Sequence, residues 1–389
     1  MKTKRILAGL ISATLIFGCL TGCGSKQDVN TEEVMENATQ AEVKDADDEK
    51  VEDDSAEKHT EVDATAGNGD KSMKIVTTIF PEYDWVKTIL GEKADNSDIT
   101  LLLDNGVDLH SYTPSVEDIA KIKECDMFVY VGGESDEWVD DVIKTADNKD
   151  MVVINLLDVL GEAVKDEELV EGMEAEHEHE DGEEADHEEA EEAEHEDGEE
   201  ADHEHEEGEE AEKDEHVWLS LRNAAILCDK IAEELGNIDE VNKDLYKSNV
   251  DAYKTELADL DAEYKSVVDA AQEKTLLFGD RFPFRYMVDD YGIKYFAAFV
   301  GCSAESEASF ETVIFLAEKI DELGLPAIMT IEGNENKIAE TVKENTKSKD
   351  QKILTLNSLQ STTTKDIENG TTYLSAMKSN LEVLKEAMK

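Results

Sequence analysis

An acidic, histidine-rich segment interrupts an otherwise regular apolar pattern, and it limits more than any other feature how this chain can fold. Residues 161–215 carry 31 acidic and 2 basic side chains, within a formal net charge of −60 for the 389 residues. The eleven residues EHEDGEEADHE occur twice without change, at 178–188 and at 194–204. Like charges at this density repel one another and extend the backbone. The segment therefore predicts a disordered surface loop rather than part of a core.

Short β-branched and apolar runs alternate with helical patterns on both sides of this loop. The strands expected from these runs are 74–79, 99–103, 127–131 and 151–156 before the loop, and 275–278, 295–300, 327–331 and 352–356 after it. Such alternation is typical of parallel α/β units. Residues 219–271 contain no proline and predict one helical stretch, whose second half has apolar and aromatic side chains at helical spacing. We expect an α/β fold with two parallel-sheet lobes joined by a long rigid helix.

The start of the chain predicts a targeting segment. Residues 1–22 combine a basic beginning with an apolar run that is too short to cross a bilayer, which needs about 20 apolar residues. The sequence Leu-Thr-Gly-Cys at 20–23 resembles a bacterial lipobox, which implies lipidation of Cys23. A cleaved signal without a lipid is the alternative. Residues 23–72 are acidic and poor in large apolar side chains, so they predict a disordered tether.

The remaining boundaries follow from the strand and helix patterns. We expect an N-terminal lobe at 73–235 that contains the loop 161–215, a linking helix at 236–271, and a C-terminal lobe at 272–389. The strong negative charge repels nucleic acid and attracts cations. The chain has no HExxH motif, no GxSxG motif and no glycine-rich phosphate loop, so nothing indicates an enzyme.

Two histidines outside the acidic loop are the candidate metal ligands. His110 lies in DNGVDLHSYTPS, after the strand expected at 99–103, and His216 lies in DEHVWLSL, where the acidic loop ends. Ligands of open α/β sheets bind beyond the carboxyl ends of the strands. An imidazole nitrogen suits zinc, and a nearby carboxylate can orient the ring through its other nitrogen.

Four motifs, in the same order, resemble the zinc- and manganese-binding solute receptors of ABC importers. They occupy residues 75–91, 106–115, 133–138 and 216–221, and the resemblance extends over about 73–389. It implies two α/β lobes joined by a long helix, with a metal cleft between the lobes. It also implies a monomeric, lipid-anchored protein on the extracytoplasmic face of the cell membrane. Such a protein would deliver Zn²⁺, or alternatively Mn²⁺ or iron, to an importer permease.

The resemblance assigns ligands residue by residue. His110 and His216 match the first two histidine ligands of the family, and Glu332 matches an acidic position after a strand. Arg281 occupies the position of the usual third histidine, and an arginine stays protonated and does not ligate a cation. Asp280 is the expected substitute. Three further candidates are two carboxylates and a thiol that would favour zinc if it reached the cleft: Glu137, Glu307 and Cys302.

The acidic loop is expected to collect metal weakly and pass it to the cleft. Six imidazoles amid many carboxylates offer low-affinity positions: His177, His179, His187, His195, His203 and His205. A solvated spacer is the alternative for this segment. Two other functions stay open from the sequence, a surface adhesin with a metal site and a metal buffer that works only through its loop. No CxxC pair exists, and Cys125, Cys228 and Cys302 permit one disulfide at most.

Overall fold

The computed structural model describes residues 72–174, 212–303, 307–333 and 336–389, which belong to one compact unit. The predicted signal peptide, the tether, the lipidation site Cys23 and the six histidines of the acidic loop lie outside these ranges. No helix within them is long and apolar enough to cross a membrane.

The N-terminal lobe is built on a parallel four-stranded sheet in the order β2-β1-β3-β4. Its strands are β1 (Lys74–Thr77), β2 (Asp98–Leu101), β3 (Met127–Tyr130) and β4 (Val152–Asn155). Its helices are α1 (Phe80–Leu90), α2 (Val116–Glu124), α3 (Trp138–Lys144) and α4 (Leu156–Leu160), with 3₁₀ turns η1 (Gly91–Asn96), η2 (Leu109–Ser111), η3 (Glu134–Asp136) and η4 (Gly161–Ala163). All four residues of β3 are buried, as expected for a central strand covered on both faces.

The C-terminal lobe repeats this arrangement with a parallel sheet in the order β6-β5-β7-β8. Its strands are β5 (Thr275–Phe282), β6 (Lys294–Val300), β7 (Ala327–Ile331) and β8 (Lys352–Leu356). Its helices are α7 (Arg285–Tyr291), α8 (Phe310–Leu323), α9 (Lys337–Asn345), α10 (Thr364–Glu368) and α11 (Tyr373–Ala387). The prediction of two lobes with parallel sheets is therefore confirmed.

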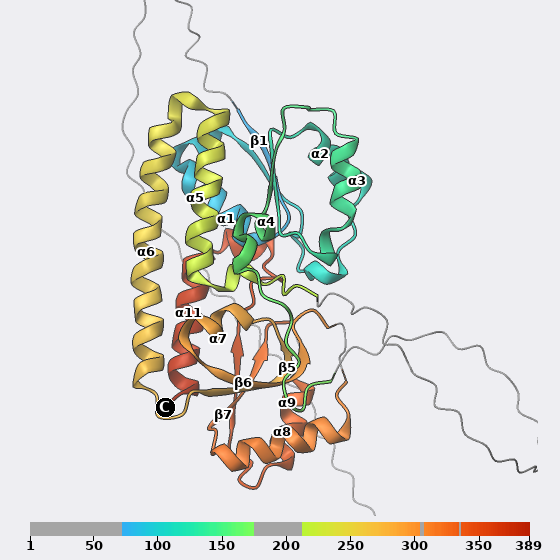
Figure 1. Ribbon diagram of the computed structural model, residues 1–389, viewed down its shortest axis with the longest axis vertical. Helices are drawn as coiled ribbons and strands as arrows, with labels where there is room; N and C mark the ends of the chain where they lie inside the picture. Colours follow the sequence, from blue (N-terminus) through green and yellow to red (C-terminus); the bar gives the residue numbers. More distant parts are fainter. Residues whose placement is uncertain (1–71, 175–211, 304–306, 334–335) are drawn as a thin grey trace, which may run out of the picture. The chain divides into compact units, whose positions relative to one another are not determined.

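The helical stretch expected at 219–271 is a helical hairpin, not one continuous helix. After the 3₁₀ turn η5 (Val217–Leu219) come α5 (Leu221–Ile238), a tight turn η6 (Glu240–Asn242) and α6 (Lys243–Ala270). Figure 1 shows α5 and α6 side by side. The carboxylate of Asp239 closes the turn, because it accepts hydrogen bonds from Asn242 Nδ2 at 2.6 Å and from the hydroxyl of Tyr246 at 2.8 Å.

Helix α6 is the element that joins the lobes. It has 28 residues, which at 1.5 Å per residue gives a length of about 42 Å. It packs against α1 of the N-terminal lobe and against α7 and α11 of the C-terminal lobe (Figure 1). A buried hydrogen bond reinforces this junction: the hydroxyl of Tyr264 in α6 donates to the carbonyl of Met377 in α11 at 2.6 Å. The helix starts at Lys243, seven residues after the expected start of the linking helix.

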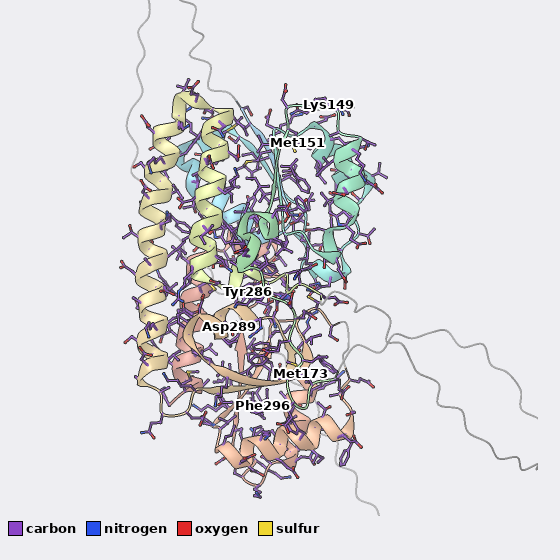
Figure 2. All side chains as sticks on the ribbon, viewed as in Figure 1. Lys149, Met151, Met173, Tyr286, Asp289 and Phe296 are labelled. Atoms are coloured by element: carbon purple, nitrogen blue, oxygen red, sulfur yellow. The ribbon has the colours of Figure 1, made fainter. Side chains whose placement is uncertain are left out.

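Both ends of the acidic segment 161–215 are fixed to the folded part of the chain. The backbone N–H of Glu174 donates to the carbonyl of Ala298 in β6 at 3.0 Å. The hydroxyl of Tyr286 in α7, labelled in Figure 2, donates to the carbonyl of Asp214 at 2.7 Å. The first fourteen and the last four residues of the segment are thus described as parts of the fold, although the sequence placed them in a disordered loop. Hydrogen bonds between the backbone of these residues and the lobes hold the two ends in place, which the charge pattern of the segment did not reveal.

Candidate metal site

The two candidate histidines meet where the lobes adjoin. His110 lies in η2, on the connection that follows β2, and His216 immediately precedes η5. Their Nε2 atoms are 3.2 Å apart, and their ring centroids are 5.2 Å apart. Two imidazole nitrogens on a tetrahedral zinc ion, each bonded at 2.0–2.1 Å, lie about 3.3 Å from each other. The pair is therefore spaced as two ligands of one ion are.

The ring of His110 is held from behind by polar groups. Its Nδ1 lies 2.8 Å from Ser135 Oγ and 3.4 Å from Glu215 Oε2. Its backbone N–H donates to Asp108 Oδ1 at 3.1 Å, which starts the 3₁₀ turn η2. Glu215 is fixed in turn, because its Oε1 accepts the backbone N–H of Ser135 at 2.9 Å. Gly133 makes room for this carboxylate, since a Cβ there would lie 2.3 Å from Glu215 Oε1.

The ring of His216 is held by a carboxylate two residues before it. Asp214 Oδ1 lies 3.0 Å from His216 Nδ1 and accepts the backbone N–H of His216 at 2.9 Å. The side chain of His216 is completely buried. When each Nδ1–H donates to its oxygen partner, each Nε2 keeps its lone pair, and the two lone pairs face each other across 3.2 Å. Two facing lone pairs repel each other, and a cation bound between them would remove this repulsion by accepting both. The carboxylates keep the rings in the orientation that this binding needs.

Burial and charge move the two imidazoles in opposite directions. Burial, followed by the charges of His216 and Arg281, lowers the pKa of His110 to about 3, so this ring is neutral at neutral pH. Burial also acts to lower the pKa of His216, but the carboxylates of Asp214 and Glu215 outweigh it and raise that pKa above its ordinary value. Neutral imidazole is the form that ligates metals.

A thiol from the C-terminal lobe completes the cluster. Within the described ranges, one group of three potential ligands is close enough to share an ion, namely His110, His216 and Cys302, whose donor atoms all lie within 4.8 Å of one another. Cys302 follows β6, and its backbone N–H donates to Glu167 Oε1 at 3.1 Å. Burial and the nearby carboxylates, first that of Glu167, raise the pKa of the thiol.

The expected acidic ligands of the second lobe lie outside this group and hold backbone atoms instead. Asp280 lies on β5, where its Oδ2 accepts the backbone N–H of Ile331 at 3.1 Å. Both oxygens of Glu332 accept hydrogen bonds from Ser358, at 2.6 and 2.7 Å. The remaining two candidates are exposed side chains, Glu137 and Glu307.

Arg281, at the position where the family resemblance expected a third histidine, forms an ion pair with Asp108 of the other lobe. Its Nη1 also donates to the carbonyl of Ser303 at 3.3 Å. The guanidinium therefore links the lobes beside the histidine pair and supplies no ligand.

A cavity of about 230 Å³ opens beside the cluster. His110 and Cys302 line it together with Glu134 and Glu212, and Glu212 is the residue at which the described chain resumes after residues 175–211. Its lining holds three carboxylates against one ammonium group, that of Lys213, and this excess of negative charge attracts a cation toward the histidines.

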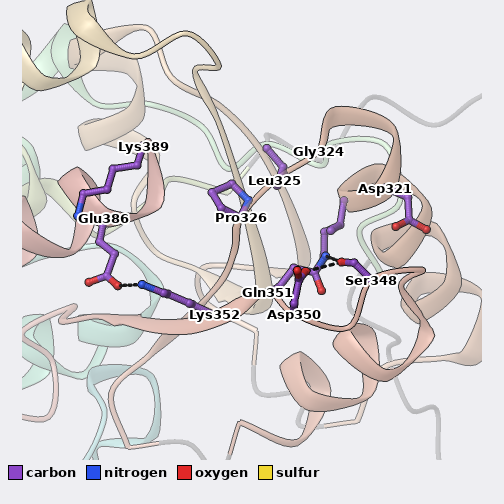
Figure 3. A pocket seen from close by; sticks show the side chains of 11 residues that line it. Asp321, Gly324, Leu325, Pro326, Ser348, Asp350, Gln351, Lys352, Glu386 and Lys389 are labelled. Atoms are coloured by element: carbon purple, nitrogen blue, oxygen red, sulfur yellow. Dashed lines mark hydrogen bonds and ion pairs between the residues drawn. The ribbon is translucent and has the colours of Figure 1, made fainter.

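A second cavity, of about 510 Å³, lies near the end of α11 and has neither histidine nor cysteine in its lining (Figure 3). Two of its charged groups, Lys352 and Glu386, pair with each other at 2.5 Å. We assign no ion to it.

Sequence reasoning missed the groups that orient the rings. These are Asp214, Glu215 and Ser135. For Asp214 a signal existed, since a carboxylate two residues before a histidine can reach its Nδ1. For Glu215 none existed, because it approaches His110, which is distant in the chain. For Ser135 no local signal existed, because it meets His110 only through the packing of two loops.

Comparison with known proteins places these features in a family. Residues 75–387 match the family described as zinc-uptake complex component A, periplasmic. The zinc-binding lipoprotein AdcA of Streptococcus pneumoniae R6 is 32% identical over 319 residues, which cover 82% of this chain and 56% of the relative. The high-affinity zinc uptake system protein ZnuA of Bacillus subtilis 168 is 30% identical over 320 residues, which cover 82% and 88%.

Among solved structures, the Zn(II)-bound ZnuA-like domain of Streptococcus pneumoniae AdcA superposes with a TM-score of 0.59 at 26% identity. The match covers 82% of this chain and 99% of that domain. The chain spans about half the length of the AdcA proteins that it matches.

Proposed function

Since the chain belongs to the zinc-uptake complex component A family, we propose that it captures Zn²⁺ outside the cytoplasm and delivers it to an ABC importer. The observation that carries the proposal is the pair of Nε2 atoms of His110 and His216, 3.2 Å apart, with an oxygen acceptor beside each Nδ1. This arrangement suits one ion gripped where the lobes meet. The names of the relatives, a zinc-binding lipoprotein and a zinc uptake system protein, support zinc as the ion.

The residues of the site divide the work of capture. His110 and His216 are the proposed ligands, and Asp214, Glu215 and Ser135 orient them. The ring of His216 is completely buried, whereas that of His110 faces the cavity. Asp280 and Glu332 stay predictions, since each would have to release a backbone N–H before it could turn to the ion. Manganese or iron remains the alternative cargo.

The membrane attachment and the loop complete the proposal. Lipidation of Cys23 would anchor the chain on the extracytoplasmic face, as the lipoprotein relative supports. The six loop histidines would collect Zn²⁺ weakly and pass it to the tight site. Deletion of residues 175–211 is then expected to remove weak zinc equivalents and to leave one tight site. Loss of the tight site in equilibrium titrations would contradict this division of labour.

The proposed function is tested by substituting each proposed ligand in the full chain. His110→Ala and His216→Ala are each expected to lower the affinity of the tight zinc site at least about 100-fold, because each removes a ligand. Competition against a chromophoric chelator at one zinc equivalent measures this affinity. His59→Ala, which changes a histidine of the predicted tether, serves as the matched control and should leave it unchanged. Tight binding that survives both substitutions would overturn the proposal.

The choice between zinc and manganese requires a second measurement. Zinc should displace Mn²⁺ from the site at equal concentration, because imidazole ligands favour zinc in the general affinity order of divalent metals. Manganese electron paramagnetic resonance reports the free ion directly. Retention of Mn²⁺ against an equal amount of Zn²⁺ would support the alternative cargo.

A further inference from the structure

The C-terminal lobe places a sulfur atom near the histidine pair, whereas Arg281 occupies the position where the family resemblance expected a third histidine ligand. Arg281 is turned toward Asp108 and Ser303, and Asp280 holds the backbone of β7. Cys302 instead reaches the histidine pair, with its Sγ within 4.8 Å of a donor nitrogen on each ring. A sulfur ligand at 2.3 Å and an imidazole nitrogen at 2.0–2.1 Å on one tetrahedral zinc ion lie about 3.6 Å apart. The observed sulfur–nitrogen distances, of up to 4.8 Å, shorten to this value through a small adjustment of the side chain or of the loop that carries it.

The backbone before the thiol is shaped for this approach. Gly301 packs so closely on His216 that a Cβ would lie 2.9 Å from the ring atom Cε1 and 2.9 Å from the carbonyl oxygen of Phe282. The absence of a side chain lets the connection after β6 pass directly over the buried ring. The next residue is Cys302, whose Sγ is thereby brought within 4.8 Å of a donor nitrogen on each ring. The cysteine's position thus depends on a close approach of the two lobes and not on chance proximity at the surface.

We propose that the thiolate of Cys302 is the third protein ligand of the captured ion, which makes the site a two-histidine, one-cysteine site selective for zinc over manganese. This inference rests on the proposed function. On binding, the metal–sulfur bond replaces the S–H bond, and the proton leaves to solvent. A thiolate is a soft ligand that favours Zn²⁺, whereas Mn²⁺ prefers carboxylate, carbonyl and water oxygens. Its negative charge also compensates part of the charge of the ion between two neutral rings.

Cobalt(II) provides a direct probe of the sulfur ligand. The full chain loaded with one equivalent of Co²⁺ should show the intense near-ultraviolet absorption of a thiolate-to-cobalt charge transfer. Cys302→Ser should remove this band, because a serine hydroxyl has no comparable transition. Cys125→Ser is the matched control: this buried thiol belongs to the N-terminal lobe, where it donates to the carbonyl of Ile122 at 3.1 Å, and a hydroxyl can keep that bond.

Selectivity provides the second readout. Cys302→Ser is expected to weaken Zn²⁺ binding at least about 10-fold and to change Mn²⁺ binding little, so the ratio of the two affinities falls by a similar factor. A wild-type chain without the charge-transfer band, or a variant with unchanged selectivity, would overturn the sulfur ligand. If His110→Ala still abolished tight binding in that case, the proposed receptor function would stand without it. If neither histidine mattered, both proposals would fall.

Discussion

Arg281 of β5 forms an ion pair with Asp108, two residues before His110 in the other lobe. Both side chains are largely buried, with 19% and 15% of their surfaces exposed. The guanidinium is close enough to His110 to contribute to the lowering of the pKa of that ring. The same cation therefore links the lobes and opposes a second positive charge at the site. Arg281 therefore stabilises the fold through its ion pair with Asp108 and lowers the affinity for a metal cation through its positive charge.

Arg281→Gln is expected to separate these two effects. Removing the cation leaves the largely buried Asp108 without its partner, which should lower the free energy of unfolding by about 1–3 kcal/mol. The same change leaves an extra negative charge beside the histidines, so the affinity for Zn²⁺ should rise severalfold. Urea unfolding in the presence of a chelator measures the first quantity, and chelator competition measures the second.

The double variant with Asp108→Asn provides the control for this pair. The asparagine keeps a side-chain oxygen that can accept the backbone N–H of His110 at the start of η2. Because it is uncharged, replacing Arg281 in this variant leaves no unpaired buried charge at position 108. The loss of stability in the double variant should thus be smaller than the sum of the two single losses. A fall in zinc affinity in Arg281→Gln would show that the ion pair matters for holding the site together more than for repelling the ion.

Asp214→Asn tests whether a charge is needed behind His216. The asparagine oxygen can still accept from Nδ1 and from the backbone N–H, so the ring should keep its place. The lost negative charge makes the ring a weaker ligand, and zinc affinity should fall about 10-fold. Asp251→Asn, on an exposed face of α6, is the matched control. Unchanged affinity in Asp214→Asn would mean that the hydrogen bond alone orients the ring.

The two-lobed fold could be predicted because its strands are short, apolar and regularly spaced, and such patterns depend only on local sequence. The helical hairpin could not, because nothing as strong as a proline marks the turn at 239–242. The turn forms through side-chain bonds to Asp239, which a helical pattern does not reveal. For the same reason the continuous helix expected at 219–271 was wrong, although most of its apolar positions are buried, Val250, Leu257 and Tyr264 among them.

The site was predictable where its chemistry is local. His110 and His216 were found from motifs around each residue, and the structure brings their rings together. The approach of Cys302 depends on Gly301 packing against His216 across the two lobes, a contact between residues 85 positions apart, so no local pattern could establish it. The acidic tracts drew attention to carboxylates as ligands, whereas the described carboxylates nearest the rings lie behind them.

Asp136, which follows Ser135 in the chain, carries a buried carboxyl whose proton affects stability. Its Oδ2 accepts the backbone N–H of Gly132 at 3.0 Å, and its Oδ1 has no hydrogen-bond partner. Burial, with a further contribution from the charge of Glu215, raises the pKa of Asp136 from 3.8 to about 7. Glu82 is a second buried carboxyl close enough to interact with it. The folded protein therefore favours the protonated form of Asp136.

The sign of the resulting pH dependence follows from the two states of this carboxyl. Below pH 3.8 Asp136 holds its proton whether the chain is folded or unfolded, so its contribution to stability is fully present. Between that pH and about 7 the unfolded chain releases the proton and the folded chain keeps it, so stability falls as the pH rises. A shift of this size corresponds to a loss of up to about 4 kcal/mol.

Asp136→Asn should remove this pH dependence, since the amide oxygen can accept from Gly132 and the group does not titrate. In the presence of a chelator, the free energy of unfolding of the variant relative to wild type should increase between pH 5 and pH 8. Urea unfolding at several pH values in this window measures the difference. Asp140→Asn, at an exposed position of α3, is the control and should follow the wild type. Parallel pH profiles for Asp136→Asn and wild type would show that Asp136 is already ionised in the folded protein at neutral pH.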